Sequence, residues 1–148
     1  MAKFPAHTSP AHTWLVMIKA MQALTKYAVS SIQAAGLGDS EFRILEVLLH
    51  KGPLPVNTIG PMVDLTPGSI SVAVDRLLER GLVSRKECRA DRRVRTVALT
   101  KKGKAVIVPV FRRHAADMEK VFSELTASEL RSLEDALKKV GKRAQTIN

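Results

Sequence analysis

Apolar residues recur at helical spacing near both ends of the chain. One set is Trp14, Met17, Met21, Leu24 and Ala28, and the other is Leu130, Leu133, Leu137, Val140 and Ala144. The steps alternate between three and four residues, so each set follows one side of a helix. The second helix is expected to begin at Thr126-Ala127-Ser128-Glu129, which has the form of a capping box. Core packing is the usual cause of such a stripe, but both stripes lie at the ends of the chain, so we interpret them as an interface with a second copy.

Two shorter helices are predicted between these ends. Asp39 or Ser40 opens the first, which closes at Lys51-Gly52. Its shared apolar side is expected to consist of Phe42, Leu45, Leu48 and Leu49. The second spans roughly residues 57–63 and contains Pro61, which removes a hydrogen bond and clashes with the preceding turn unless it lies near the helix start. We therefore expect either Asn57 or Thr58 to be the N-cap, or the helix to be bent.

A further helix has clear start and stop signals. Thr66 is the expected N-cap and Pro67 the first helical residue, where its missing N–H has no cost. Gly81 ends the helix, as a glycine at the C′ position does. The buried side is expected to consist of Ile70, Ala73, Val74, Leu77 and Leu78. The opposite side begins with small residues, so that another molecule could approach the backbone closely: Gly68, Ser69 and Ser71.

A β-hairpin is predicted directly after this helix. Residues 83–87 and 95–99 have strand propensity, and the turn between them is rich in arginine. A long helix from about Lys101 to Phe122 follows, with a kink expected at Pro109. The chain is therefore predicted to be mainly α-helical with one small β-hairpin, an α+β fold in which residues 1–148 form a single domain.

The charge of the chain indicates a class of partner. Lysine and arginine total 24 against 14 acidic residues, which gives a formal net charge of +10. A polyanion fits such a surface, although a basic surface can serve solubility alone. The basic residues gather around the predicted hairpin, which favours nucleic acid: Arg85, Lys86, Arg89, Arg92, Arg93 and Arg95.

The small-residue helix and the basic hairpin together are typical of proteins that bind double-stranded DNA. A helix N-terminus favours a phosphate, and small side chains let the helix enter a major groove. Arginines at a hairpin tip suit phosphates and a narrow groove. The alternative for each such residue is a polar surface that solvent alone requires. The candidate DNA-binding residues are Thr66, Pro67, Gly68, Ser69, Ser71, Val72, Arg76, Arg85, Arg92, Arg93 and Arg95.

The same stretches resemble the MarR (multiple-antibiotic-resistance regulator) family of transcription factors. The resemblance runs from about Leu37 to the C-terminus and is strongest at Asp91-x-Arg93 followed by Leu99-Thr100-x-x-Gly103. It also includes Val74-Asp75-Arg76-Leu77-x-x-Arg80-Gly81-Leu82-Val83. Three stretches are similar to a branch that responds to hydroquinones, quinones or related phenols: Gly52-Pro53-Leu54-Pro55, Gly68-Ser69-Ile70 and Cys88-x-x-Asp91-Arg92-Arg93.

The resemblance implies a homodimer with two winged helix-turn-helix lobes. Residues 37–103 would form the lobe, with Arg93 at the tip of the wing, and residues 10–36 and 104–148 would form the dimerisation helices. Such a dimer binds a pseudo-palindromic operator, and we expect a repressor that a small aromatic effector releases. The candidate pocket residues would serve equally as dimer core: Trp14, Met17, Met21 and His114.

Cys88 is the single cysteine of the chain. Nearby basic residues favour its thiolate, so that oxidation or attack by a quinone would act on the wing, whereas Glu87 opposes this activation. A redox-sensing regulator that uses Cys88 without a bound ligand is therefore an alternative. One cysteine excludes an internal disulfide, and no set of Cys and His has the spacing of a metal site, so we expect neither metal nor cofactor.

Other classes of protein find little support in the sequence. Residues 1–13 lack the apolar core of a signal peptide, and no later run reaches membrane-spanning length, so we expect a cytoplasmic protein without a membrane partner. We find no glycine-rich phosphate loop, nucleophile elbow or paired carboxylates, and therefore do not expect an enzyme. An architectural protein that binds DNA through charge, without reading sequence, is the alternative from another class.

Overall fold

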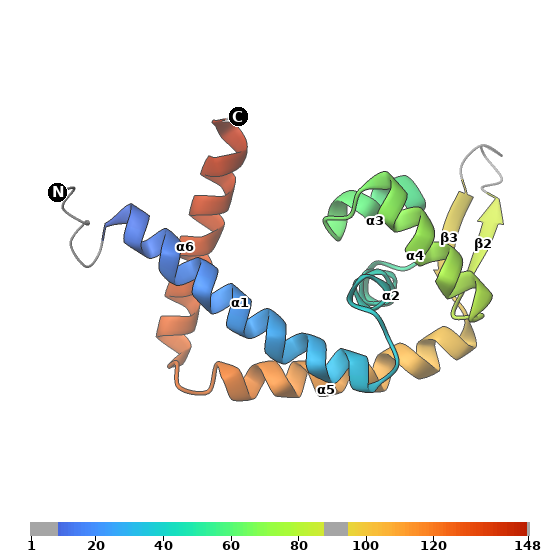
Figure 1. The fold of residues 1–148 in the computed structure, drawn as a ribbon, viewed down its shortest axis with the longest axis horizontal. Helices are drawn as coiled ribbons and strands as arrows, with labels where there is room; N and C mark the ends of the chain where they lie inside the picture. The colour runs from blue at the N-terminus through green and yellow to red at the C-terminus, as the bar shows by residue number, and fades with distance from the viewer. Residues whose placement is uncertain (1–8, 88–94, 148) are drawn as a thin grey trace. The chain divides into compact units, whose positions relative to one another are not determined.

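The computed structural model describes residues 9–87 and 95–147 (Figure 1). The chain divides into two compact units, Met1–His114 and Ala115–Asn148. The first unit contains α1 to α4, the sheet and the first part of α5, and the second contains the rest of α5 and α6. Within the described ranges, no helix is both long enough and apolar enough to span a membrane.

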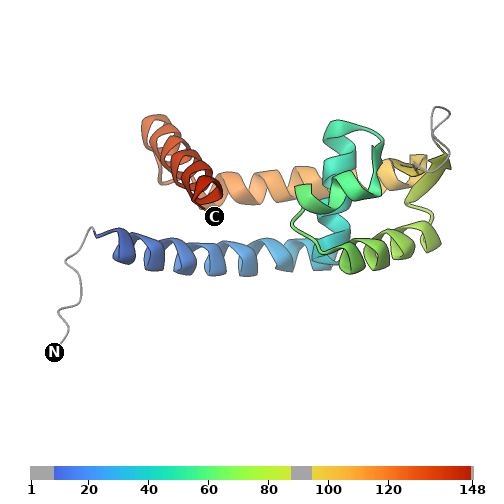
Figure 2. The same cartoon turned by 90° about the horizontal axis from the view of Figure 1, so that it is seen from above.

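The first unit opens with α1 (Pro10–Ala34), which Figure 2 shows as one long helix. Ser9 caps its start, because the side chain accepts a hydrogen bond from the N–H of His12 at 3.1 Å. Pro10 occupies the first helical position, where a proline is well tolerated. Ile32 is the buried residue of α1. Most of this helix therefore has no contact with the core of its own unit.

Helix α2 (Asp39–Lys51) begins and ends as the sequence predicts, with Gly52 as its C-cap. Phe42, Leu45 and Leu48 are buried, and Leu49 is half-buried. Gly52 has φ of 78°, in the left-handed region that favours glycine, so the chain can leave the helix sharply.

The expected start of α3 (Val56–Met62) is wrong. Its N-cap is Pro55 rather than Asn57 or Thr58, so Pro61 is the sixth residue of the helix. The reason is a short strand that the sequence analysis missed, β1 (Leu54–Pro55), which keeps the chain extended through Pro55. Pro61 is tolerated near the C-terminal end, where it removes a single helical hydrogen bond. The alternative expectation of a bend stays a prediction.

Helix α4 (Pro67–Glu79) confirms the predicted start and stop. Thr66 is the N-cap, Pro67 is the first residue, and Gly81 follows with φ of 67°. Figure 1 shows α4 grouped with α2, α3 and the hairpin. Four of the five residues predicted to be buried are so: Ile70, Ala73, Val74 and Leu77. The fifth, Leu78, is only half-buried.

The predicted hairpin strands are β2 (Val83–Glu87) and β3 (Arg95–Leu99), which pair antiparallel from Val83 with Leu99 to Glu87 with Arg95. The other edge of β3 pairs with β1, so the sheet has the order β1-β3-β2. Val97 on this central strand is completely buried. It contributes to a core that α2, α3, α4 and the start of α5 share, with these fully buried side chains: Ile44, Leu45, Ile59, Val74, Leu77 and Ile107.

Helix α5 (Lys101–Val121) begins at a very close contact with the turn between α4 and β2. A Cβ atom at Gly103 would lie 1.9 Å from the carbonyl oxygen of Leu82, so only glycine fits this position. The Thr100 hydroxyl donates to the Gly81 carbonyl at 2.7 Å and accepts from the Gly103 N–H at 2.9 Å. The Leu99-Thr100-x-x-Gly103 motif therefore fixes the start of α5 against the turn after α4.

In the second unit, α6 (Ala127–Thr146) starts at the predicted capping box. The Glu129 N–H donates to the Thr126 hydroxyl, and the Glu129 carboxylate accepts from the Thr126 N–H at 2.8 Å. None of the residues of α6, all of which the structure describes, is buried. Its apolar stripe is open to solvent in the single chain, with Leu130, Leu133, Leu137 and Val140 between 39% and 56% exposed.

Candidate nucleic-acid interface

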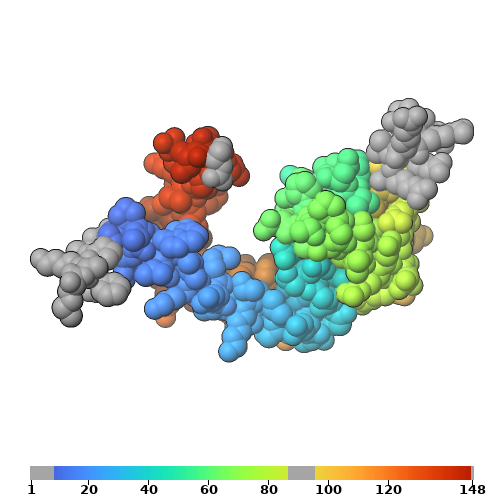
Figure 3. Space-filling view, turned by 45° about the horizontal axis from the view of Figure 1, so that its top comes forward, coloured from blue at the N-terminus to red at the C-terminus, as the bar shows by residue number. Residues whose placement is uncertain are grey.

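The outer side of α4 is an exposed surface built from small residues. Thr66, Pro67, Gly68, Ser69, Ser71, Val72 and Arg76 are all exposed. Apart from the backbone of its own helix and its chain neighbours, no heavy atom of the described residues lies within 4 Å of where a Cβ at Gly68 would stand. The first turn of α4 is therefore exposed and carries small side chains, while the predicted contact with DNA stays a prediction. Figure 3 shows the surfaces of α3 and α4 side by side, in green.

The hydroxyl groups at this end of α4 are oriented by internal hydrogen bonds. The Thr66 hydroxyl accepts from the Ser69 N–H at 3.2 Å and lies 2.9 Å from the Ser69 hydroxyl. The Ser71 hydroxyl donates to the Pro67 carbonyl at 3.0 Å. Because the Ser71 proton is used inside the helix, its oxygen lone pairs are what this side chain offers to a partner.

A hollow of about 680 Å³ lies between the outer side of α4 and the start of α2. Ser69, Val72 and Arg76 line it from α4, and Asp39 and Ser40 line it from α2. The positive charge of Arg76 and the N-terminal end of α2 both favour a phosphate at this surface, whereas the Asp39 carboxylate opposes one. Arg43 offsets that carboxylate, with Nη2 2.6 Å from Asp39 Oδ2.

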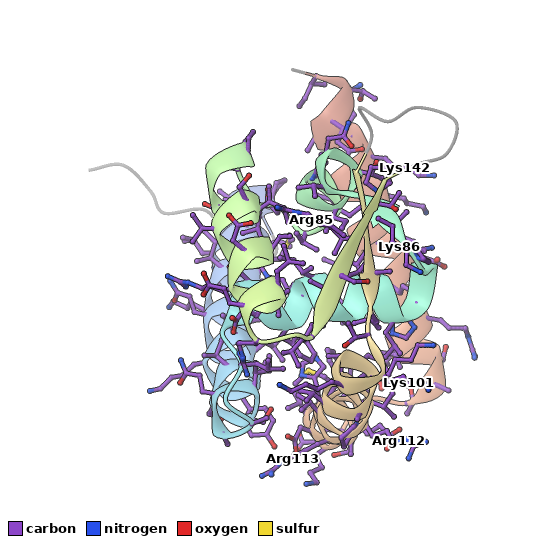
Figure 4. All side chains as sticks on the ribbon, turned by 90° about the vertical axis from the view of Figure 1, so that its right-hand side faces the viewer. Arg85, Lys86, Lys101, Arg112, Arg113 and Lys142 are labelled. Carbon is purple, nitrogen blue, oxygen red and sulfur yellow. The ribbon has the colours of Figure 1, made fainter. Side chains whose placement is uncertain are left out.

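The wing is joined to α4 by an ion pair. Arg85 on β2 lies 2.9 Å from Asp75 on the exposed side of α4. Figure 4 shows Arg85 on the side of β2 toward α4 and Lys86 on the other side. Asp75 would repel a DNA backbone, and Arg85 offsets its charge while remaining partly exposed. The predicted DNA-binding residue Arg85 thus also fixes the wing to the helix.

Two braces hold α4 and its preceding turn on α2, and the sequence analysis named neither. Arg80 donates to the buried Glu41 carboxylate at 3.0 Å, and the same carboxylate accepts from the Gly38 N–H at 2.9 Å. Arg43 donates to the Val63 carbonyl at 2.8 Å, at the end of α3. Glu41 is a visible capping residue at the third position of α2, but no local signal pairs it with Arg80 across 39 positions.

The tip of the predicted wing lies outside the described residues. Cys88, Arg92 and Arg93 belong to it, so their predicted roles stay predictions. Arg95 begins β3, where its backbone is paired with Glu87. Among the described residues, no group of three or more His, Cys, Asp or Glu side chains is arranged to hold a metal ion.

Three of the four candidate effector residues come together on α1. Trp14, Met17 and Met21 line an open apolar groove of about 890 Å³, together with polar residues that include Lys26 and Gln33. His114 is not among the lining residues. It lies in α5 with its ring 5.2 Å from that of Phe42, in an edge-to-face contact. Its Nδ1 atom is buried and has no hydrogen-bond partner among the described residues.

Comparison with known proteins identifies relatives of the chain. Residues 35–94 match the MarR family. The HTH-type transcriptional regulator MhqR of Bacillus subtilis (strain 168) is 34% identical over 135 residues, which cover 91% of this chain and 93% of MhqR.

Two solved structures extend the comparison. AbsC, a MarR family transcriptional regulator from Streptomyces coelicolor, superposes with a TM-score of 0.85 over 97% of this chain and 99% of AbsC. The two sequences are 21% identical, so this similarity is one of fold alone. The PcaV transcriptional regulator from Streptomyces coelicolor was solved in complex with its natural ligand. It has a TM-score of 0.74 and 26% identity over 97% of this chain and 99% of PcaV.

The pair of helices α3 and α4, followed by the β2–β3 hairpin, defines a winged helix-turn-helix protein. The sequence relationship with MhqR spans nine-tenths of both chains. The chain belongs to the MarR family of transcriptional regulators, which are DNA-binding proteins.

Proposed function

We propose that the protein is a homodimeric repressor that binds a pseudo-palindromic operator and leaves it when a small aromatic effector binds. The observation that carries this proposal is the outer side of α4, which is capped by Thr66, small in its first turns and next to a basic strand. A helix of this form enters a major groove, and two copies related by a two-fold axis would read half-sites about 34 Å apart.

The exposed apolar stripe of α6 supports the dimer. A helix whose apolar residues are all open to solvent in the single chain needs a partner to remove them from water. The apolar stripe of α1, with Trp14 60% and Met21 58% exposed, is a second surface of this kind. Both stripes lie outside the helix-turn-helix, so a dimer formed through them leaves α4 free for DNA.

The groove on α1 supports an aromatic effector. Its apolar lining, with a few polar side chains, is typical of a small-molecule site. The structure of PcaV with its natural ligand is a precedent for ligand binding in a related fold. The same side chains fit a dimer core, so a response to an effector has to be measured.

A fluorescence-anisotropy titration tests the proposed function. The protein is titrated against the DNA upstream of its own gene and against a scrambled duplex of equal length, at about 150 mM salt, where screening weakens loose charge contacts. We expect a preference on the order of a thousandfold, and release of the preferred duplex on addition of hydroquinone. Cyclohexane-1,4-diol, which lacks the aromatic ring, is the matched control. If the preferred duplex stays bound under hydroquinone, this class of effector is excluded.

Failure to prefer the upstream DNA leads to a second step, because a regulator can act on distant promoters. Selection from a pool of random duplexes then decides the question. A selected motif supports the regulator, and equal, salt-sensitive binding of all duplexes supports the architectural alternative, which the net charge of +10 also fits.

The wing contributes an arginine that can be tested in the same assay. We expect Arg93→Ala to lose at least about tenfold in operator affinity, because the negative potential of a narrow minor groove attracts an inserted arginine. Arg112→Ala is the matched control, since it removes the same charge from the exposed side of α5, outside the helix-turn-helix. Equal affinity of the Arg93 variant and the wild type would remove this residue from the interface.

A further inference from the structure

Val72 is an apolar side chain in the middle of the surface that faces DNA under the proposed function. It is 53% exposed. The structure describes every residue of α4, and Val72 is the one large apolar side chain of this helix that is exposed. Its neighbours on this surface are polar or very small, with Ser69 three positions before it and Arg76 four positions after it. The contacts of the folded chain give no reason for a valine at this position.

The surroundings of Val72 leave room for direct contact with a base pair. Gly68, one turn before it, has no heavy atom within 4 Å of where a Cβ would stand. The same surface continues into the hollow that Ser69, Val72 and Arg76 line. The residues one turn before Val72, Gly68 and Ser69, are small, so they leave Val72 accessible from the N-terminal end of the helix.

The chemistry around Val72 selects among the four base pairs. The two valine methyl groups favour an apolar partner, and the major-groove edge of DNA offers one, the C5-methyl group of thymine. The oxygen of Ser71, whose proton is donated to the Pro67 carbonyl, is an acceptor. Adenine presents an amino donor in the same base-pair edge, with thymine O4 between that donor and the methyl group. An A·T pair therefore matches both groups.

We infer that Val72 contacts the C5-methyl group of one thymine in each operator half-site and so specifies an A·T pair there. The inference rests on the proposed function and adds a residue that determines sequence preference. Each such contact removes about one methyl group from water, which corresponds to about a fourfold change in affinity, or about fifteenfold when both half-sites are altered.

The test replaces each thymine of the preferred duplex by uracil, which removes the methyl group and keeps the base-pair hydrogen bonds. With the wild type, we expect one thymine per half-site at which uracil weakens binding about fourfold. With Val72→Ala, the same replacement should have no effect. Combining both changes isolates the interaction between the two groups from any effect of either change alone.

Two controls make the result decisive. Glu79→Ala alters an exposed residue of the same helix outside the proposed DNA-binding surface, and it should keep the uracil effect at the same thymine. Val72→Ala should fold normally, because the side chain is exposed and alanine is the better helix former. Its thermal unfolding is compared with that of the wild type.

The outcomes that overturn the inference are distinct from failure of the proposed function. If no uracil weakens binding, or if the uracil effect persists in Val72→Ala, the contact is absent although the protein still reads sequence. If random-duplex selection gives no preferred duplex, the proposed function fails, and this inference fails with it.

Discussion

Gly103 shows how much a single residue decides in this fold. A methyl group at this position would meet the Leu82 carbonyl at 1.9 Å, and the obstacle is backbone rather than a side chain that can turn away. Thr100 holds the same junction through hydrogen bonds to Gly81 and Gly103. The turn after α4 and the start of α5 are therefore held together at one point.

We expect Gly103→Ala to lower the free energy of unfolding by at least about 3 kcal/mol, because relieving the overlap requires the backbone to shift. Urea denaturation of the purified variant measures this loss. Gly68→Ala is the matched control, since it adds the same methyl group to a helix with no heavy atom within 4 Å. The control should be neutral or more stable by up to about 1 kcal/mol. Equal stability of the two variants would contradict the overlap.

Contacts between residues that are distant along the chain could not be predicted from the sequence. The Leu99-Thr100-x-x-Gly103 motif identifies a family resemblance, but its reason lies in an approach between Gly103 and Leu82 that the chain pattern does not contain. The braces Glu41–Arg80 and Arg43–Val63 were missed for the same reason, since their partners are brought together only by packing. The exposed residues of α4 were predictable, because small polar positions outside an apolar stripe must face away from the core.

At the scale of elements, helix caps and strand propensity located most of the structure. The start of α4 at Thr66, its stop before Gly81 and both hairpin strands follow from local rules that the structure confirms. The two-residue strand β1 has no local signal, because it exists only through pairing with β3. Missing it displaced the expected start of α3.

The capping box of α6 makes a prediction at this scale. The Thr126 N–H and hydroxyl donate to the Glu129 carboxylate and lower the pKa of that carboxyl group. Because the pKa is lower in the folded chain than in the unfolded one, the cap stabilises α6 fully above the ordinary carboxyl pKa. This contribution disappears as the pH falls through the lowered value.

An NMR titration of the Glu129 carboxyl carbon checks this prediction. We expect a lowered pKa in the wild type and a return toward the ordinary value in Thr126→Ala, which removes the hydroxyl donor and the cap acceptor. Ser128→Ala changes the neighbouring residue and should leave the lowered pKa in place. A Glu129 pKa that does not respond to loss of the Thr126 hydroxyl would contradict the capping assignment.

At the scale of the whole molecule, the single chain leaves apolar residues of both stripes exposed to solvent. The sequence located both stripes, but their periodicity alone is equally typical of core packing. The structure separates the two for α6, because none of its residues is buried. In the proposed dimer, a second copy of the chain covers this stripe.

We expect Leu137→Arg to abolish the homodimer, because a charge in the middle of the stripe would have to be desolvated on association. Light scattering should give about twice the chain mass of 16.2 kDa for the wild type and the single mass for the variant. Ser132→Arg introduces the same side chain on another side of α6 and should remain dimeric. A dimeric Leu137 variant would place the interface elsewhere.

The buried and exposed sides of α4 consist of different residues, so the exposed side can change without altering the core. The inward residues Ile70, Ala73, Val74 and Leu77 are part of the core, while Ser69, Val72 and Arg76 carry none of it. Under the proposed function, substitutions at the outward positions would alter which DNA is preferred, and because these side chains are exposed they would have little effect on folding. Under the proposed function, a duplicated gene would therefore reach a new set of promoters through a few outward codons, while the residues that build its scaffold stay unchanged.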